Sequence, residues 1–227
     1  MKLLAVETAT EACSAALFID GEVIERFQLA PQTHTRLILP MIDSLLAEAG
    51  LAARDLDGLA FGRGPGSFTG VRIATGVIQG LALGLELPVA PVSTLAALAQ
   101  DYFDRQTDTF VFSAMDARMN EVFWGVYRKN SRGFAQLMGQ ESVGSAASVA
   151  FEAVHGAGVG TGWRVYREVL SARLDGWVTE YESENLPRAG AIAVLGAEYF
   201  AAGLQVPVEQ AQPVYLRDKV AKKESER

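Results

Sequence analysis

The chain is short of the side chains that most metal sites and nucleophilic enzymes need. Its 227 residues include one cysteine, Cys13, and two histidines, His34 and His155. A lone cysteine cannot form an internal disulfide, which is typical of a reducing compartment. A structural zinc site takes four Cys or His ligands, so three such residues far apart predict no metal site. The HExxH, CxxC, GxSxG and P-loop motifs are absent as well.

The chain also lacks an excess of positive charge and a long hydrophobic run. It has 20 Lys and Arg against 27 Asp and Glu, a net charge of −7. Nucleic-acid binding needs a basic surface, so we expect this chain to meet RNA only through a complex. The apolar run Ile73–Leu85 falls short of the roughly 18 residues of a membrane helix. The N-terminus reads as a strand rather than a secretion signal, which predicts a cytoplasmic protein with no membrane contact.

Short apolar runs and turn signals predict an α/β protein. Three runs read as strands and are joined in part by the hairpin signal Asp20-Gly21. Helices and strands then alternate, which gives the order βββαβαβα. The expected strands of this half are Lys2–Val6, Cys13–Ile19, Glu22–Leu29, Leu56–Phe61 and Val89–Val92, and the expected helices are Arg36–Ala49, Phe68–Leu85 and Thr94–Phe103.

The second half of the chain repeats this order. Its expected strands are Thr109–Met115, Glu121–Tyr127, Phe134–Met138, Ala157–Gly162 and Trp177–Tyr181, and its expected helices are Val143–Phe151, Trp163–Leu174 and Ala189–Ala202. An acidic residue ends the first strand both times, Glu7 and then Asp116. We therefore predict two lobes, residues 1–108 and 109–227, with the tail returning to the first lobe and ending in the charged run Lys219–Arg227. Duplicated ribonuclease-H-like βββαβα lobes are typical of the actin-like and Hsp70-like (ASKHA) folds.

The two turns after the acidic residues are candidate phosphate sites of a small-molecule kinase. Glu7, Thr8 and Thr10 could hold a phosphate and its magnesium ion. Ala9 stands where a glycine would let the backbone approach a phosphate, so a plain polar hairpin turn is the alternative. The second turn, from Asp116, has no glycine, and its Arg118 is expected to pair with Asp116 or Glu121. This makes a kinase with magnesium and ATP the weaker hypothesis.

The second expected helix begins at a glycine-rich turn. A helix N-terminus after glycines can hold an anion, but the lysine of a P-loop is missing here. We favour a tight strand-to-helix turn with Ser67 or Thr69 as the N-cap.

Two helices of the first half carry more apolar surface than one sheet can cover. The apolar side chains of Arg36–Ala49 span about 200° of the helix, and a helix on one sheet needs little over 100°. In the next helix three glycines four residues apart leave room for a second helix, at about 1 kcal/mol each relative to alanine. A deeply buried helix and a subunit interface both explain this. The expected interface residues are Leu37, Leu39, Met41, Ile42, Leu46, Ile73, Gly76, Val77, Gly80 and Gly84.

Five stretches of the chain resemble the TsaB (YeaZ) family of bacterial tRNA threonylcarbamoyladenosine biosynthesis. They are Leu3–Ser14, Leu39–Ile42, Met115–Val122, Pro213–Arg217 and, most specific, Gly62–Ile73 with the sequence GRGPGSFTGVRI. The resemblance runs through nearly the whole chain and is weakest in residues 140–183. It implies an actin-like fold without catalysis of its own.

The resemblance also implies partners. A TsaD-like subunit would transfer threonylcarbamoyl to adenosine 37 of tRNAs that read codons beginning with A, and this chain would bind it through the first-half helices. TsaD relatives bind a metal through HxxxH, whose two histidines align here with Thr94 and Leu98. A TsaE-like ATPase would join the assembly, and the chain alone would form a homodimer. No cofactor is expected, and a nucleotide at a subunit boundary stays open.

Overall fold

Two five-stranded sheets form the frame of the protein in a computed structural model that describes residues 1–217. The first has the order β3-β2-β1-β4-β5 and the second β10-β9-β6-β7-β8, which is the same order read from the other end. Each combines an antiparallel meander with two parallel strands. The strands are β1 (Lys2–Glu7), β2 (Ala12–Ile19), β3 (Glu22–Leu29), β4 (Gly58–Gly62), β5 (Val89–Val92), β6 (Phe110–Asp116), β7 (Val122–Lys129), β8 (Ala135–Gly144), β9 (Gly156–Val159) and β10 (Val178–Glu182). The duplicated α/β fold predicted from the sequence is confirmed, and the charged run Lys219–Arg227 lies outside the described residues.

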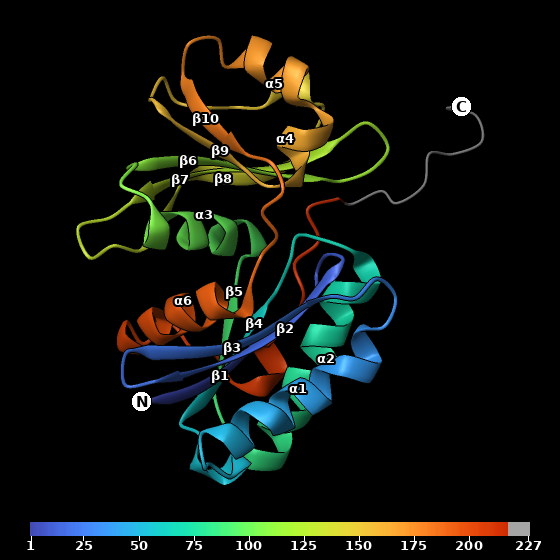
Figure 1. The fold of residues 1–227 in the computed structure, drawn as a ribbon, viewed down its shortest axis with the longest axis vertical. Helices are drawn as coiled ribbons and strands as arrows, with labels where there is room; N and C mark the ends of the chain where they lie inside the picture. Colours follow the sequence, from blue (N-terminus) through green and yellow to red (C-terminus); the bar gives the residue numbers. More distant parts are fainter. Residues whose placement is uncertain (218–227) are drawn as a thin grey trace.

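Helices cover both faces of both sheets (Figure 1). On the outer face of the first sheet lie α1 (His34–Glu48) and α2 (Phe68–Leu85), and on that of the second lie α4 (Thr161–Val165) and α5 (Arg167–Arg173). Between the sheets lie α3 (Thr94–Arg105) and α6 (Ala189–Ala201), which contact each other. One apolar cluster includes residues of both sheets and of both central helices, so the two sheets share a core.

The two central helices are exchanged between the halves of the chain. α3 follows β5 in the sequence but packs on β6, β7 and β8 of the second sheet. α6 comes from the second half but packs on β1, β2, β4 and β5 of the first. After α6 the chain stays on the first sheet, where Val206 pairs with Val89. The predicted boundary at residue 108 falls between the two sets of strands, and a cut there would leave each sheet without its inner helix.

Two local predictions in the second half are wrong. The segment Val143–Phe151 is not a helix, because β8 continues to Gly144 and pairs with β7 there, and only the short 3-10 turn η2 (Ala146–Ser148) follows. Cross-strand pairing thus overrides a weak helical pattern. The predicted helix Trp163–Leu174 is two short helices, because the backbone of Tyr166 leaves the helical region at φ −116° and ψ 22°.

α2 starts as the sequence predicts and is longer than its apolar run suggests. Ser67 is the N-cap, and its hydroxyl accepts a hydrogen bond from the Gly70 amide at 3.4 Å. Within residues 1–217, α2 is the one helix whose length and composition would suffice to cross a membrane, contrary to the expectation from the run alone. A core helix passes the same test, and α2 packs one face on β4 and β1.

Candidate functional site

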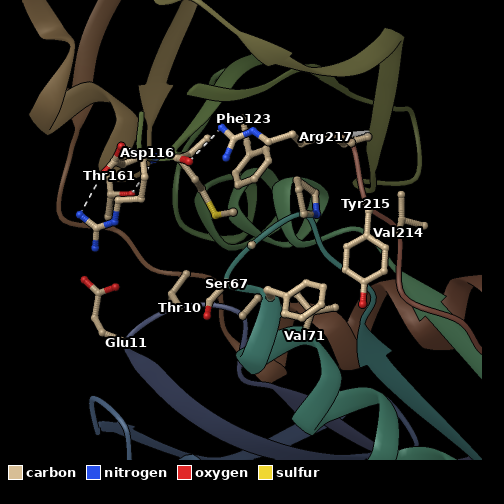
Figure 2. A pocket seen from close by; sticks show the side chains of 18 of the residues that line it. Thr10, Glu11, Ser67, Val71, Asp116, Phe123, Thr161, Val214, Tyr215 and Arg217 are labelled. Carbon is tan, nitrogen blue, oxygen red and sulfur yellow. Dashed lines mark hydrogen bonds and ion pairs between the residues drawn. The ribbon is translucent and has the colours of Figure 1, made fainter. Parts of the chain in front are cut away.

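A cavity of about 760 Å³ opens where the first strands of the two sheets end (Figure 2). The turn after β1 and the start of α2 line it from one side, and the end of β6 and the start of α4 from the other. A further wall is formed by residues 214–217 of the C-terminal segment. The cavity lies between the two turns that the sequence offered as candidate phosphate sites.

The first candidate phosphate turn is closed by α2. Glu7 and Thr8 are 1% and 0% exposed, and only Thr10 of the three predicted residues lines the cavity. The Thr8 hydroxyl donates to the Gly70 carbonyl at 2.7 Å, and a Cβ on Gly70 would lie only 2.0 Å from the Thr8 carbonyl oxygen. Backbone of the α2 start therefore packs directly on Thr8, and only the later residues of the turn reach the cavity.

Glu7 is a buried carboxyl with neutral partners. Its two oxygens accept hydrogen bonds from the Ala9 amide and, at 3.2 Å, from the Thr94 hydroxyl. Burial disfavours the charged form and raises the pKa of Glu7 to about 7, although these hydrogen bonds act in the opposite direction. A magnesium ion needs an ionised and accessible carboxylate. In this structure Glu7 is a core group rather than a metal ligand.

The second turn is held by its own ion pair. Asp116 pairs with the Arg118 guanidinium at 3.1 Å, which confirms one of the two predicted pairings. Its carboxylate also accepts a hydrogen bond from the Arg118 amide at 2.9 Å. Glu121, the other predicted partner, pairs with Arg217 instead. Three successive residues without glycine, Arg118, Met119 and Asn120, have φ of +60°, +56° and +61°. Both carboxylate oxygens of Asp116 are engaged within the protein, and the turn has no glycine at which a phosphate could approach the backbone closely.

The metal site of TsaD relatives has no counterpart in the described structure. Thr94 and Leu98, which align with the two histidines, are buried. Thr94 donates to Glu7, and Leu98 belongs to the core shared by the two sheets. Among residues 1–217, no three His, Cys, Asp or Glu side chains gather as metal ligands would.

The predicted interface residues divide by exposure. Leu39, Gly76, Gly80 and Gly84 are exposed, and Leu37, Met41, Leu46, Ile73 and Val77 are partly buried. Ile42 is 3% exposed and packs in the core, so this prediction placed a core residue on the surface. The middle of the apolar arc of α1, not one of its edges, faces the sheet. The sequence analysis missed Leu83, which at 71% is more exposed than Leu39 at 50% and lies between Gly80 and Gly84. Its signal was a leucine among the glycines of the uncharged stretch Ile73–Leu85.

Three glycines of α2, Gly76, Gly80 and Gly84, have no packing role among the described residues, unlike Gly70 at the start of the helix. A Cβ added to Gly76, Gly80 or Gly84 would meet no atom within 4 Å, whereas one on Gly66 would lie 2.6 Å from the Ala9 Cβ. Glycine inside a helix costs about 1 kcal/mol relative to alanine. Nothing in the described structure offsets that cost at these three positions, which favours a close contact outside the chain.

Comparison with known proteins adds a family. The model of the family "TsaD: tRNA N6-adenosine threonylcarbamoyltransferase" matches residues 28–225. The chain is 43% identical to the tRNA threonylcarbamoyladenosine biosynthesis protein TsaB of Escherichia coli K12 over 97% of this chain and 96% of that protein. It is 40% identical to TsaB of Haemophilus influenzae over 97% of this chain and 95% of that protein.

A solved structure has the same fold. YeaZ from Pseudomonas aeruginosa superposes with a TM-score of 0.88 at 44% identity, over 95% of this chain and 99% of that chain. A second structure of the same likeness is described as an uncharacterized protein with similarity to peptidase YEAZ.

Proposed function

Because the chain belongs to the TsaB family of tRNA threonylcarbamoyladenosine biosynthesis proteins, we propose that it is an accessory subunit that binds a TsaD-like catalytic subunit. That subunit would transfer threonylcarbamoyl to adenosine 37 of tRNAs that read codons beginning with A. The chain itself would perform no chemistry, and tRNA would reach it only through the complex.

The observation that carries this proposal is the open face of α2. The backbone is uncovered at Gly76, Gly80 and Gly84. Leu83 exposes a large apolar side chain among these three glycines. Together with Leu39 of α1 they offer a helix-sized contact surface, which a partner helix can approach closely. We call the exposed residues Leu39, Gly76, Gly80, Leu83 and Gly84 the helical face.

The remaining members of the assembly follow from family membership. A TsaE-like ATPase would join the pair, and without its partner the chain would form a homodimer through the helical face. We propose no resident cofactor, and a nucleotide would be held, if at all, at a subunit boundary. The complex would work in the cytoplasm.

The alternative of a small-molecule kinase has little support. The first turn is covered by the start of α2, and the second has its carboxylate paired with Arg118. The named relatives are biosynthesis proteins of a tRNA modification. ATP binding by the isolated chain, measured by calorimetry, would revive this alternative.

Charge on the helical face tests the proposal. Leu83→Asp and Leu39→Asp should leave the chain folded, because both side chains are at least half exposed. Each should weaken binding to the TsaD-like subunit about thirtyfold or more if it meets a hot spot. Titration calorimetry measures the affinity, and mass spectrometry of tRNA nucleosides measures the modification.

A matched control separates surface from core. Leu137→Asp places the same charge at an exposed leucine of β8 and should bind normally. Ile42→Asp buries an unpaired charge and should unfold the chain. Wild-type affinity in both Leu83→Asp and Leu39→Asp would contradict the proposal.

A further inference from the structure

The C-terminal segment returns to α2 and runs along one edge of it. We call residues 211–217 the strap. Ala211 is buried, and its carbonyl accepts a hydrogen bond from the Gln79 amide group at 2.8 Å. Two helical turns nearer the start of α2, the Arg72 guanidinium donates to the Tyr215 hydroxyl at 2.9 Å. The strap therefore runs antiparallel to the helix, from Gln79 toward its N-terminus.

The strap and the start of α2 build an exposed aromatic cluster. The rings of Phe68 and Tyr215 lie 5.5 Å apart, and the Arg72 guanidinium lies 3.7 Å from the centre of the Phe68 ring. Phe68 is 51% and Tyr215 44% exposed. Figure 2 shows Tyr215 and Val214 side by side at the rim of the cavity. A pair of large aromatic side chains half open to water is apolar surface that no residue among 1–217 covers.

This cluster adjoins the helical face. In a helix, Arg72 and Gln79 fall on one edge of α2, while the half-buried Ile73 and Val77 fall on the other. Gly76 and Gly80 lie between the two edges. The strap therefore runs along the edge of α2 that lies opposite Ile73 and Val77.

The strap is fixed at both ends. Val214 donates its amide to the Arg63 carbonyl at 2.8 Å, which ties it to the first sheet. At the far end Arg217 pairs with Glu121 and donates to the Ala117 carbonyl at 3.1 Å, both in the turn after β6. Tyr215 lies between these two anchors. A side chain held in place before binding loses less conformational entropy when a partner covers it.

We propose that the strap is part of the partner-binding surface, with Tyr215 and Phe68 as its anchors, and that its occupant is the TsaD-like catalytic subunit. This inference rests on the proposed function, since it extends the helical face to the N-terminal end of α2. Tyrosine and arginine are enriched among the residues that dominate binding energy, and such residues lie in preorganised apolar clusters. The cluster contains both types and is continuous with the glycine face.

Ring removal tests the strap. Tyr215→Ala and Phe68→Ala, made separately in the full chain, should each raise the dissociation constant for the purified TsaD-like subunit about thirtyfold. Tyr215→Phe keeps the ring, loses only the hydrogen bond to Arg72, and should bind within a few-fold of wild type. Leu137→Ala serves as a surface control, and circular dichroism reports folding of every variant.

Leu83→Asp, measured in parallel, separates this inference from the proposed function. Loss of binding in Leu83→Asp with wild-type affinity in both ring variants would overturn the role of the strap and keep the partner. Wild-type affinity in all three would overturn both. Ring variants that weaken self-association of the chain but leave affinity for the TsaD-like subunit unchanged would assign the strap to a second copy, and would overturn the occupant proposed here.

Discussion

The turns after β1 and after β6 occupy equivalent places in the two halves but differ in almost every physical respect. The beginning of the first turn, Thr8 and Ala9, is buried, and the start of α2 packs directly on its backbone. The second is exposed, has three successive residues with positive φ, and is held by Arg118 and by the strap. The same topology thus supplies one turn made rigid by burial and one made rigid by ion pairs.

This difference suggests how a duplicated fold can be put to another use. The first turn has become part of the core, where Glu7 contacts neutral donors only. The second has become an attachment point for the C-terminal strap. Between them the cavity remains, and residues of both turns line it.

The substitution with the largest expected effect on stability adds a methyl group where α2 packs on the first turn. Gly70→Ala would place a Cβ 2.0 Å from the Thr8 carbonyl oxygen, which is backbone and cannot move aside without shifting β1 or α2. We expect a loss of unfolding free energy of about 3 kcal/mol or more. Urea denaturation followed by circular dichroism measures it.

The matched control is Gly76→Ala in the same helix. Its Cβ meets no atom within 4 Å, so we expect the unfolding free energy to rise by about 1 kcal/mol because alanine favours the helix more than glycine does. Equal effects of the two substitutions would mean that the first turn is not packed as described. A loss of partner binding in Gly76→Ala alone would further support the helical face.

The buried carboxyl of the first turn predicts a pH dependence of stability. The pKa of Glu7 is raised to about 7, so the folded chain holds this proton more tightly than the unfolded chain. The resulting stability is fully present below about pH 4.5 and is lost as the pH rises to about 7. Glu7→Gln should remove this loss. At pH 8 its free energy of unfolding should exceed that of the wild type by up to about 3 kcal/mol.

Urea titrations at pH 5 and pH 8 check this expectation. The glutamine can still accept from the Ala9 amide and can donate to the Thr94 hydroxyl, so the hydrogen bonds are kept. Glu11→Gln, in the same turn but exposed, is the control and should follow the wild type. A Glu7→Gln variant with unchanged pH dependence would refute the burial argument.

The substitution with the smallest expected effect removes backbone strain from the second turn. Met119 is exposed and has φ of +56°, a conformation that costs a non-glycine residue about 1 kcal/mol. Met119→Gly should therefore stabilise the chain by up to about 1 kcal/mol in thermal denaturation. Ala9→Gly, in the covered first turn, should not stabilise it, because Ala9 has no positive φ to relieve.

Features coded by neighbouring residues could be predicted from the sequence. Asp20 and Gly21 form the hairpin turn, with φ of +50° and +104°, and Ser67 is the N-cap of α2. The repeated succession of strands and helices along the chain also follows from local patterns. These elements depend on backbone preferences that residues a few positions apart already fix.

Features made by distant residues could not be predicted in this way. No local pattern shows that the start of α2 packs on Thr8, or that Arg217 crosses to Glu121. The expected exposure of Ile42 failed for the same reason, because helix periodicity gives an apolar arc but not its orientation on the sheet. The exposure of Leu83 likewise depends on how α2 is oriented on the sheet, which its local sequence does not determine.

The exchange of α3 and α6 also has a consequence during synthesis. When β5 leaves the ribosome, the first sheet has all its strands but its inner face is bare until α6 follows about a hundred residues later. At about 5–20 residues per second, this face stays open for roughly 5–20 s. The nascent chain carries uncovered apolar strands throughout that interval, which is the kind of surface that chaperones shield. The first sheet is therefore completed only when the C-terminal half of the chain, which contains α6, has left the ribosome.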